Sequence, residues 1–238
     1  MRIRNTVYLD HQATTPIDPR VLAEMAPYYS ELIGNPHSSD HSLGWASARA
    51  VEDAATRVAR LIGADADEII FTSGATEANN LGLLGLCRRA AGGHRRRVLV
   101  SAIEHKCVLA VGGVLQEQLG YEVEYIPVDA AGSVEMSTLQ EALADDVLVV
   151  SVMAVNNEIG TIQDIPTISQ AVREVGALLH CDAAQAPCAM DLRGFSDLVD
   201  LLSLSSHKMY GPQGIGALFI LRDLQDRIEP LIYGGGQQ

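Results

Sequence analysis

The sequence predicts an α/β protein: a three-layer fold built on a mostly parallel sheet of seven strands. Short β-branched apolar runs alternate with amphipathic stretches of helical period along the 238 residues. The runs are apolar at nearly every position, which is typical of strands that are buried on both faces. The loop between the last two runs, "SHKMYGPQG" (206–214), is too short for a parallel crossover, so the final pair of strands is expected to be antiparallel.

The expected strands and helices follow one another in a simple order. The strands are "EIIFT" (68–72), "RVLVSA" (97–102), "VEYIPV" (123–128), "VLVVSVM" (147–153), "ALLHC" (177–181), "LVDLLSLS" (198–205) and "GALFIL" (216–221). The helices are the amphipathic stretches at 45–62, 76–90, 106–118, 137–144 and 166–175. The first forty residues, rich in Pro, Asn, His and Ser, are expected to be a tail and a loop. We assign residues 1–15 to an N-terminal segment and residues 16–238 to one large domain.

Composition excludes several classes of function. The net charge of −13 and the pI of about 4.8 predict no nucleic-acid partner, because an acidic surface repels phosphate backbones. The arginine run at 95–97 is expected to be a solvated face. No stretch approaches the roughly 18 apolar residues of a membrane span, and the N-terminus lacks a signal-peptide pattern, so no membrane association is expected. Four cysteines without CxxC spacing favour a reducing cytoplasm.

Ligands of an open α/β sheet bind beyond the C-terminal ends of its strands, so the residues just after each predicted strand are the candidates for a site. After 68–72 comes "SGAT" (73–76), where Gly74 allows close approach of backbone N–H groups, Thr76 adds a hydroxyl and a helix dipole favours an anion. The alternative is a simple N-cap with a tight turn. His105 comes after the next strand and is either a proton shuttle or a hydrogen-bonded neighbour. Asn156 is a neutral donor in a loop, which is a weak signal.

The ends of the fifth and sixth predicted strands carry charged groups. Asp182 is a candidate to hold a cationic group, with Gln185 as a donor beside it. A zinc site from His180, Cys181 and Asp182 is disfavoured, because three consecutive strand residues cannot converge on one ion. Lys208 is one of only two lysines among seventeen basic residues. It is either a surface lysine near a turn or a reactive amine, since lysine can form a Schiff base whereas arginine cannot.

Together these groups match the requirements of pyridoxal phosphate. The cofactor needs an anion cradle for its phosphate, a carboxylate opposite its pyridinium nitrogen and a lysine for its aldehyde. We therefore predict a pyridoxal-phosphate site and no metal site.

Seven ordered motifs give the chain a resemblance to a known family. They are "YLDHQATTPIDPRV", "GNPHSSDHSLGW", "FTSGATEANN", "IEHKCVL", "VSVMAVNNEIGTIQ", "HCDAAQ" and "SSHKMYGPQGIGAL". With them the chain resembles the cysteine desulfurases, fold-type-I pyridoxal-phosphate enzymes of the class V aminotransferase group. It looks like the branch that serves iron–sulfur cluster assembly.

The resemblance implies a role for each site residue. Lys208 would form the Schiff base, Asp182 would pair with the pyridine nitrogen and Gln185 would bond the phenolic oxygen. His105 would stack on the ring and move protons, and Asn156 would lie near the ring and the substrate. The phosphate would be held by Ala75, Thr76, Ser205 and His207. The implied reaction converts L-cysteine to L-alanine and passes the sulfur through an enzyme persulfide to a scaffold or another acceptor protein, within a homodimer.

The sequence also departs from the family pattern. Relatives often have "AQAVGK" and "GPKG" where this chain has "AQAPCA" (184–189) and "GPQG" (211–214), so two lysines are lost while Lys208 stays. A small C-terminal domain with the sulfur-accepting cysteine has no match here, and none of the four cysteines corresponds to it. Two alternatives therefore remain: a truncated paralogue that binds cofactor or a partner without turnover, and another class V enzyme such as a selenocysteine lyase.

Overall fold

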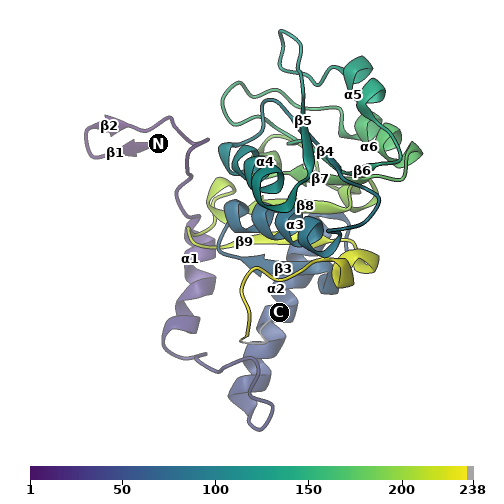
Figure 1. Cartoon of the computed structure of the whole chain (residues 1–238). Coiled ribbons are helices and arrows are strands. Elements are labelled where there is room, and N and C mark those ends of the chain that lie inside the picture. The colour runs from purple at the N-terminus through teal and green to yellow at the C-terminus, as the bar shows by residue number, and fades with distance from the viewer. Residues whose placement is uncertain (235–238) are drawn as a thin grey trace.

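A seven-stranded sheet forms the centre of the structure, a computed structural model that describes residues 1–234 (Figure 1). Its strands are β3 (Ile69–Thr72), β4 (Arg97–Ser101), β5 (Glu122–Ile126), β6 (Val147–Ser151), β7 (Leu178–Asp182), β8 (Leu201–Ser205) and β9 (Gly216–Ile220). Their order across the sheet is β3-β9-β8-β7-β6-β4-β5. Only β9 runs antiparallel, to β8 on one side and β3 on the other. The predicted strands and the antiparallel final pair are confirmed.

Helices cover both faces of the sheet. Helices α3 (Ala75–Arg89) and α4 (Lys106–Leu119) pack on one face, while α5 (Met136–Ala142), α6 (Ile165–Glu174) and the C-terminal part of α2 (Ser42–Ile62) pack on the other. In β4, Val98 and Val100 pack in the core under α3 and α4, whereas Leu99 packs in the core on the opposite face, under α2, α5 and α6. Because each strand buries both of its sides, its sequence is continuously apolar. The predicted three-layer fold is confirmed.

The N-terminal region contains more structure than the sequence analysis predicted. A short hairpin, β1 (Arg2–Ile3) and β2 (Thr6–Val7), precedes helix α1 (Pro19–Met25) and the 3-10 turn Ala26–Tyr29. The side chain of Asp18 caps α1, and a proline occupies its first position, which is a recognised start signal. No residue of α1 is buried, and its seven residues are too few to show a helical period in the sequence. The expectation of only a tail and loop was therefore wrong.

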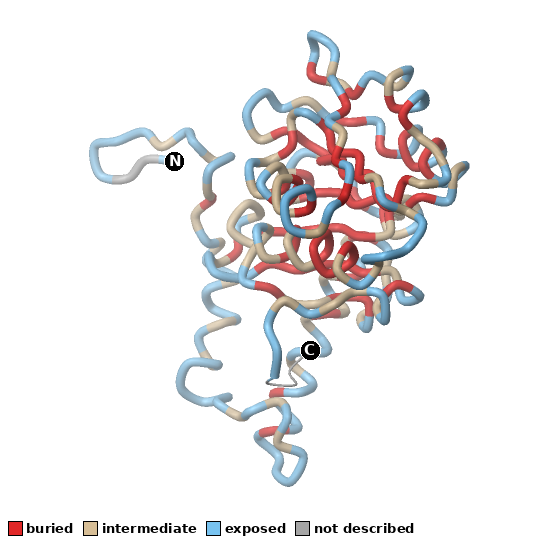
Figure 2. The backbone as a smooth tube through the Cα atoms, viewed as in Figure 1, coloured by how far each residue is buried: buried red, intermediate tan, exposed pale blue. Residues whose placement is uncertain are grey.

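This region stands away from the sheet and is mostly exposed (Figure 2). Several large apolar side chains of α1, the following loop and the start of α2 remain in contact with solvent. They are Leu22, Tyr28, Tyr29, Leu32, Ile33, Leu43, Trp45 and Val51. The domain assignment of residues 1–15 and 16–238 stays a prediction, and its last four residues lie outside the described part.

In the arginine run at 95–97, Arg96 is exposed as expected, whereas Arg95 and Arg97 are partly buried and make structural contacts. Arg95 donates to the carbonyl oxygens of Val147 and Val175, at 2.5 and 2.9 Å. Arg97 forms ion pairs with Glu124 and Asp146, at 2.7 and 3.2 Å. The run thus ties together the chain segments at the starts of several parallel strands. Among residues 1–234, no helix combines the length and the apolar character that crossing a membrane requires.

Candidate active site

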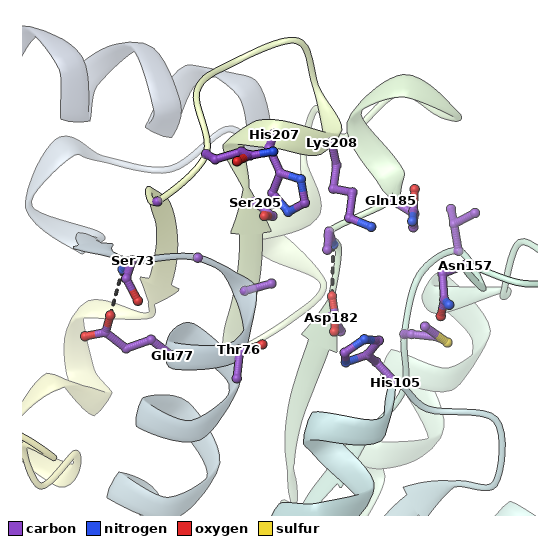
Figure 3. A pocket seen from close by; sticks show the side chains of 17 residues that line it. Ser73, Thr76, Glu77, His105, Asn157, Asp182, Gln185, Ser205, His207 and Lys208 are labelled. Atoms are coloured by element: carbon purple, nitrogen blue, oxygen red, sulfur yellow. Dashed lines mark hydrogen bonds between the residues drawn. The ribbon is translucent and has the colours of Figure 1, made fainter. Parts of the chain in front are cut away.

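A cavity of about 430 Å³ opens beyond the C-terminal ends of β7 and β8, beside the N-termini of α3 and α4 (Figure 3). Eight of the nine predicted site residues line it. They are Ala75, Thr76, His105, Asp182, Gln185, Ser205, His207 and Lys208. The sheet therefore brings together residues that are widely separated in sequence, at the edge where ligands of such sheets bind.

One wall of the cavity is the N-terminus of α3. Gly74 precedes this helix at φ 150°, a backbone conformation that favours glycine, and no side chain caps the helix. The turn lies tightly on β9, because a Cβ atom at Gly216 would come within 2.6 Å of the Gly74 Cα atom. The first N–H groups of α3 and the helix dipole thus make a cradle for an anion.

The opposite wall comes from the end of β8 and the 3-10 turn Ser206–Lys208. Ser205 is buried there, and burial and the charge of Lys208 lower the pKa of His207. His207 Nδ1 lies 3.1 Å from the hydroxyl of Thr14. The N-terminal segment therefore holds this part of the wall in place.

Asp182 lies at the end of β7 and is 4% exposed. Its Oδ1 accepts a hydrogen bond from the Ala184 N–H at 2.9 Å, and its Oδ2 accepts one from Asn79 Nδ2 at 2.7 Å. Burial raises the pKa of Asp182, and the hydrogen bonds from Ala184 and Asn79, followed by the charge of Lys208, oppose that rise. Both hydrogen-bond donors are neutral, so a cationic N–H in the cavity would stabilise the buried charge.

Lys208 Nζ donates to the Gln12 carbonyl oxygen at 2.5 Å. Gln185 Nε2 donates to the same oxygen at 2.8 Å. Burial lowers the pKa of Lys208, although nearby carboxylates, Asp182 first, oppose the shift. A lysine whose pKa is lowered is more available as a neutral nucleophile, which suits an amine that must bond a carbonyl carbon.

His105 is the N-cap residue of α4 and lies beside Asp182 in the cavity wall. Its Nδ1 accepts from the backbone N–H of Cys107 at 3.3 Å and lies 2.9 Å from the Cys107 Sγ atom. The ring is thus held from behind through one nitrogen.

The structure does not bring Asn156 to the cavity. Asn156 Nδ2 donates to the Ile103 carbonyl oxygen at 2.9 Å, and its Oδ1 accepts from the N–H groups of Glu158 and Ile159. These bonds shape the loop after β6, and the neighbouring Asn157 lines the cavity instead. The pair "NN" gave no signal for choosing between the two. Asn79, which contacts Asp182 from inside α3, is a further residue of the site that was not predicted from the sequence.

The alternative zinc site is not formed. His180 Nδ1 lies 2.8 Å from the Ser151 hydroxyl, and burial lowers the pKa of His180 to about 3. Cys181 packs in the core on the face of the sheet opposite to that histidine. Within residues 1–234, no group of three His, Cys, Asp or Glu side chains could hold a metal ion.

A lysine, a buried carboxylate and an uncapped helix N-terminus around one cavity form the type of site that binds pyridoxal phosphate. The chain belongs to the class V aminotransferase family, whose model matches residues 7–238. Members of this family depend on pyridoxal phosphate.

Individual relatives agree with this assignment. The chain is 48% identical over 234 residues to the cysteine desulfurase IscS of Rickettsia felis and 47% identical to that of Rickettsia africae. Each alignment covers 98% of this chain but 56% of the relative, so the chain spans little more than half the length of these curated relatives.

Solved structures give the same result. The chain is similar to one described as SspA in complex with cysteine, with a TM-score of 0.91 and 38% identity over 98% of this chain and 66% of that one. It is also similar to the apo cysteine desulfurase of Thermococcus onnurineus, with a TM-score of 0.89 and 30% identity over 97% of this chain and 57% of that one.

Proposed function

We propose that this chain is the cofactor-binding large domain of a pyridoxal-phosphate-dependent cysteine desulfurase. The proposed reaction converts L-cysteine to L-alanine and transfers the sulfur to an enzyme cysteine as a persulfide. The observation that carries the proposal is the placement of Lys208 and Asp182 at the ends of adjacent strands around one cavity. The relatives named cysteine desulfurase support the choice of reaction within the family.

The residues present fit the cofactor. The N–H groups at the start of α3, with Thr76, Ser205 and His207, would hold the phosphate, because they present donors at a helix N-terminus. Asp182 would hold the ring nitrogen and keep it protonated, since a carboxylate stabilises the charged form of a neighbouring cation. Gln185 would donate to the phenolic oxygen of the ring.

When bound, pyridoxal phosphate supplies an electron sink that weakens the bonds at the α-carbon of an amino acid. The protein's own part is to bind, orient and move protons. Burial lowers the pKa of Lys208, which makes its neutral amine more available to attach the cofactor and to exchange a proton. His105 borders the cavity on the side of Asp182 and presents a second group for proton transfer.

We also propose that the enzyme acts as a homodimer in the cytoplasm and delivers sulfur to an iron–sulfur scaffold or another acceptor protein. The name IscS of its relatives supports the scaffold. The exposed apolar side chains between residues 22 and 51 offer surface for a protein contact. All four cysteines are free thiols, which suits a reducing compartment.

The test is to load the chain with pyridoxal phosphate and reduce it with borohydride, then map the labelled peptide. Label on Lys208 is expected, and label confined to Lys106 would overturn the site assignment. The chain joined to the remaining domain of a relative should form alanine from cysteine. A preference for selenocysteine would favour a selenocysteine lyase, and cofactor binding without any product would favour a paralogue that lacks turnover.

A further inference from the structure

A chain of hydrogen bonds leads from Asp182 to His105 through two residues that have no part in the function proposed above. Asn79 in α3 is fully buried. Its Nδ2 donates to Asp182 Oδ2 at 2.7 Å and to Cys107 Sγ at 3.4 Å. The Cys107 sulfur in turn lies 2.9 Å from His105 Nδ1.

The direction of donation along this chain is set by its ends. The carboxylate oxygen accepts, so the NH₂ group of Asn79 points toward Asp182 and Cys107. The sulfur therefore accepts from Asn79, which leaves its own S–H free to donate elsewhere. At the other end, the backbone N–H of Cys107 donates to His105 Nδ1 at 3.3 Å, which makes Nδ1 an acceptor. An accepting Nδ1 leaves the thiol of Cys107, 2.9 Å away, as the donor in that contact, beside the backbone N–H.

We propose that Cys107, held by Asn79, is a positioning residue that fixes His105 as the tautomer with its proton on Nε2. The proposal deepens the cysteine desulfurase function proposed above and rests on it for its catalytic meaning. With Nδ1 occupied from behind, Nε2 is the nitrogen through which His105 exchanges protons with a ligand in the cavity.

The chemical state of Cys107 agrees with a donor rather than a nucleophile. Its side chain is half-buried, and burial raises the pKa of the thiol, although the hydrogen bond from Asn79 opposes part of that rise. A thiol that keeps its proton can donate to an imidazole but is a poor sulfur acceptor. The position of Cys107 beside the cavity is therefore explained without a persulfide on it.

The test measures the tautomer directly by ¹⁵N NMR of the histidine rings in the full chain without cofactor. His105 is assigned by the signal that disappears in His105→Gln. The wild type should show a protonated Nε2 and an unprotonated Nδ1. Cys107→Ala should lower the ratio of the Nε2-protonated to the Nδ1-protonated tautomer about five-fold, which is the factor expected for the loss of one ordinary hydrogen bond.

Two further variants separate positioning from packing. Cys107→Ser keeps a donor and should retain the wild-type tautomer ratio. Cys107→Val fills the space without a donor and should show the same roughly five-fold lower ratio as Cys107→Ala. The valine variant therefore provides the test if the alanine variant does not fold. Cys188→Ala is the matched control, since this other thiol donates to the Lys208 carbonyl oxygen and does not touch His105. A protonated Nδ1 in the wild type, or an unchanged ratio in both the alanine and valine variants, would overturn the proposal.

A second readout connects the tautomer to the reaction. In the cofactor-loaded enzyme completed with a relative's remaining domain, Cys107→Val should shift the pH profile of cysteine turnover, and Cys107→Ser should restore it. If the NMR result holds but no turnover is found, the proposed function fails and the positioning role survives. If turnover is found and the tautomer ratio is unchanged, the positioning role alone fails.

Discussion

Glu104 is a carboxyl group that the fold buries behind the active site, and its replacement by glutamine tests the electrostatics of that region. Glu104 is 5% exposed. Its Oε1 accepts from the Met153 N–H at 2.5 Å, while its buried Oε2 has no hydrogen-bond partner among the described residues. Burial, followed by the charge of Asp182, raises the pKa of Glu104 from 4.5 to about 8. At neutral pH the folded protein therefore holds Glu104 mostly as the neutral acid.

The sign of the pH dependence is fixed by that shift. An unfolded chain releases the Glu104 proton near its ordinary pKa, whereas the folded chain retains it to higher pH. Between these two values the folded state binds more protons, so the free energy of unfolding falls as pH rises. The loss of unfolding free energy due to Glu104 is absent below about pH 4.5 and complete above about pH 8. At 1.36 kcal/mol per pH unit, this loss has an upper bound of roughly 5 kcal/mol.

Glu104→Gln removes the titration and keeps the shape. The amide oxygen can still accept from Met153, and the NH₂ group takes the place of an oxygen that has no partner among the described residues. In urea unfolding, the variant and the wild type should be close in stability near pH 5. Toward about pH 8.5 the variant should become the more stable protein by several kcal/mol, within the roughly 5 kcal/mol bound.

The matched control is Glu117→Gln on the exposed surface of α4, which should leave the pH dependence as it is in the wild type. Other titrating groups are common to wild type and variant, so the difference between them isolates Glu104. A difference that stays constant from low to high pH would show that Glu104 is not held neutral, and the reasoning would be refuted.

The remaining predictions concern the cofactor. Lys208→Arg should abolish borohydride labelling while Lys106→Arg leaves it intact; the reverse pattern would contradict the assignment. Asp182→Asn should weaken cofactor binding roughly 10-fold in a fluorescence titration, because the carboxylate's charge is lost from its hydrogen bond to the ring nitrogen; an equal effect of Asn156→Ala would argue against this. His105→Ala should keep the fold by circular dichroism and bind the cofactor but lose the absorbance changes on adding cysteine; a failure to fold would favour a structural role. The 238-residue polypeptide alone should form little alanine from cysteine, because burial raises the pKa of all four thiols; full turnover would contradict this.

The features that the sequence predicted well depend on local patterns. Strands such as β6 and β8 are apolar at nearly every position because the sheet is covered on both sides, and this leaves a continuous run in the sequence. The positions of Lys208 and Asp182 obey the same rule, since parallel strands end at one edge of the sheet. Lysine scarcity then separated Lys208 from an ordinary surface residue.

The features that the sequence could not predict depend on tertiary contacts. Asn156 and Asn157 are adjacent and chemically identical, and only the fold of the loop decides that Asn156 bonds the backbone while Asn157 faces the cavity. Asn79 lies within a helix whose sequence pattern is amphipathic, so its contact with Asp182, 103 residues away, leaves no trace in spacing. Helix α1 has only seven residues, which is too short a stretch for a helical period to be recognised.

The buried polar groups of the site give cofactor binding a role in stability. Asp182 and Glu104 both have raised pKa values, which means that their charged forms are disfavoured in the folded chain without a ligand. A protonated ring nitrogen beside Asp182 would favour its charged form and lower its pKa. A ligand that binds only the folded state stabilises that state by mass action. Pyridoxal phosphate should therefore raise stability most above the pH at which Asp182 ionises in the folded chain, where the carboxylate would otherwise have no cationic partner from the cofactor. The same carboxylate that makes the empty site less stable is then the group that selects a cationic ring.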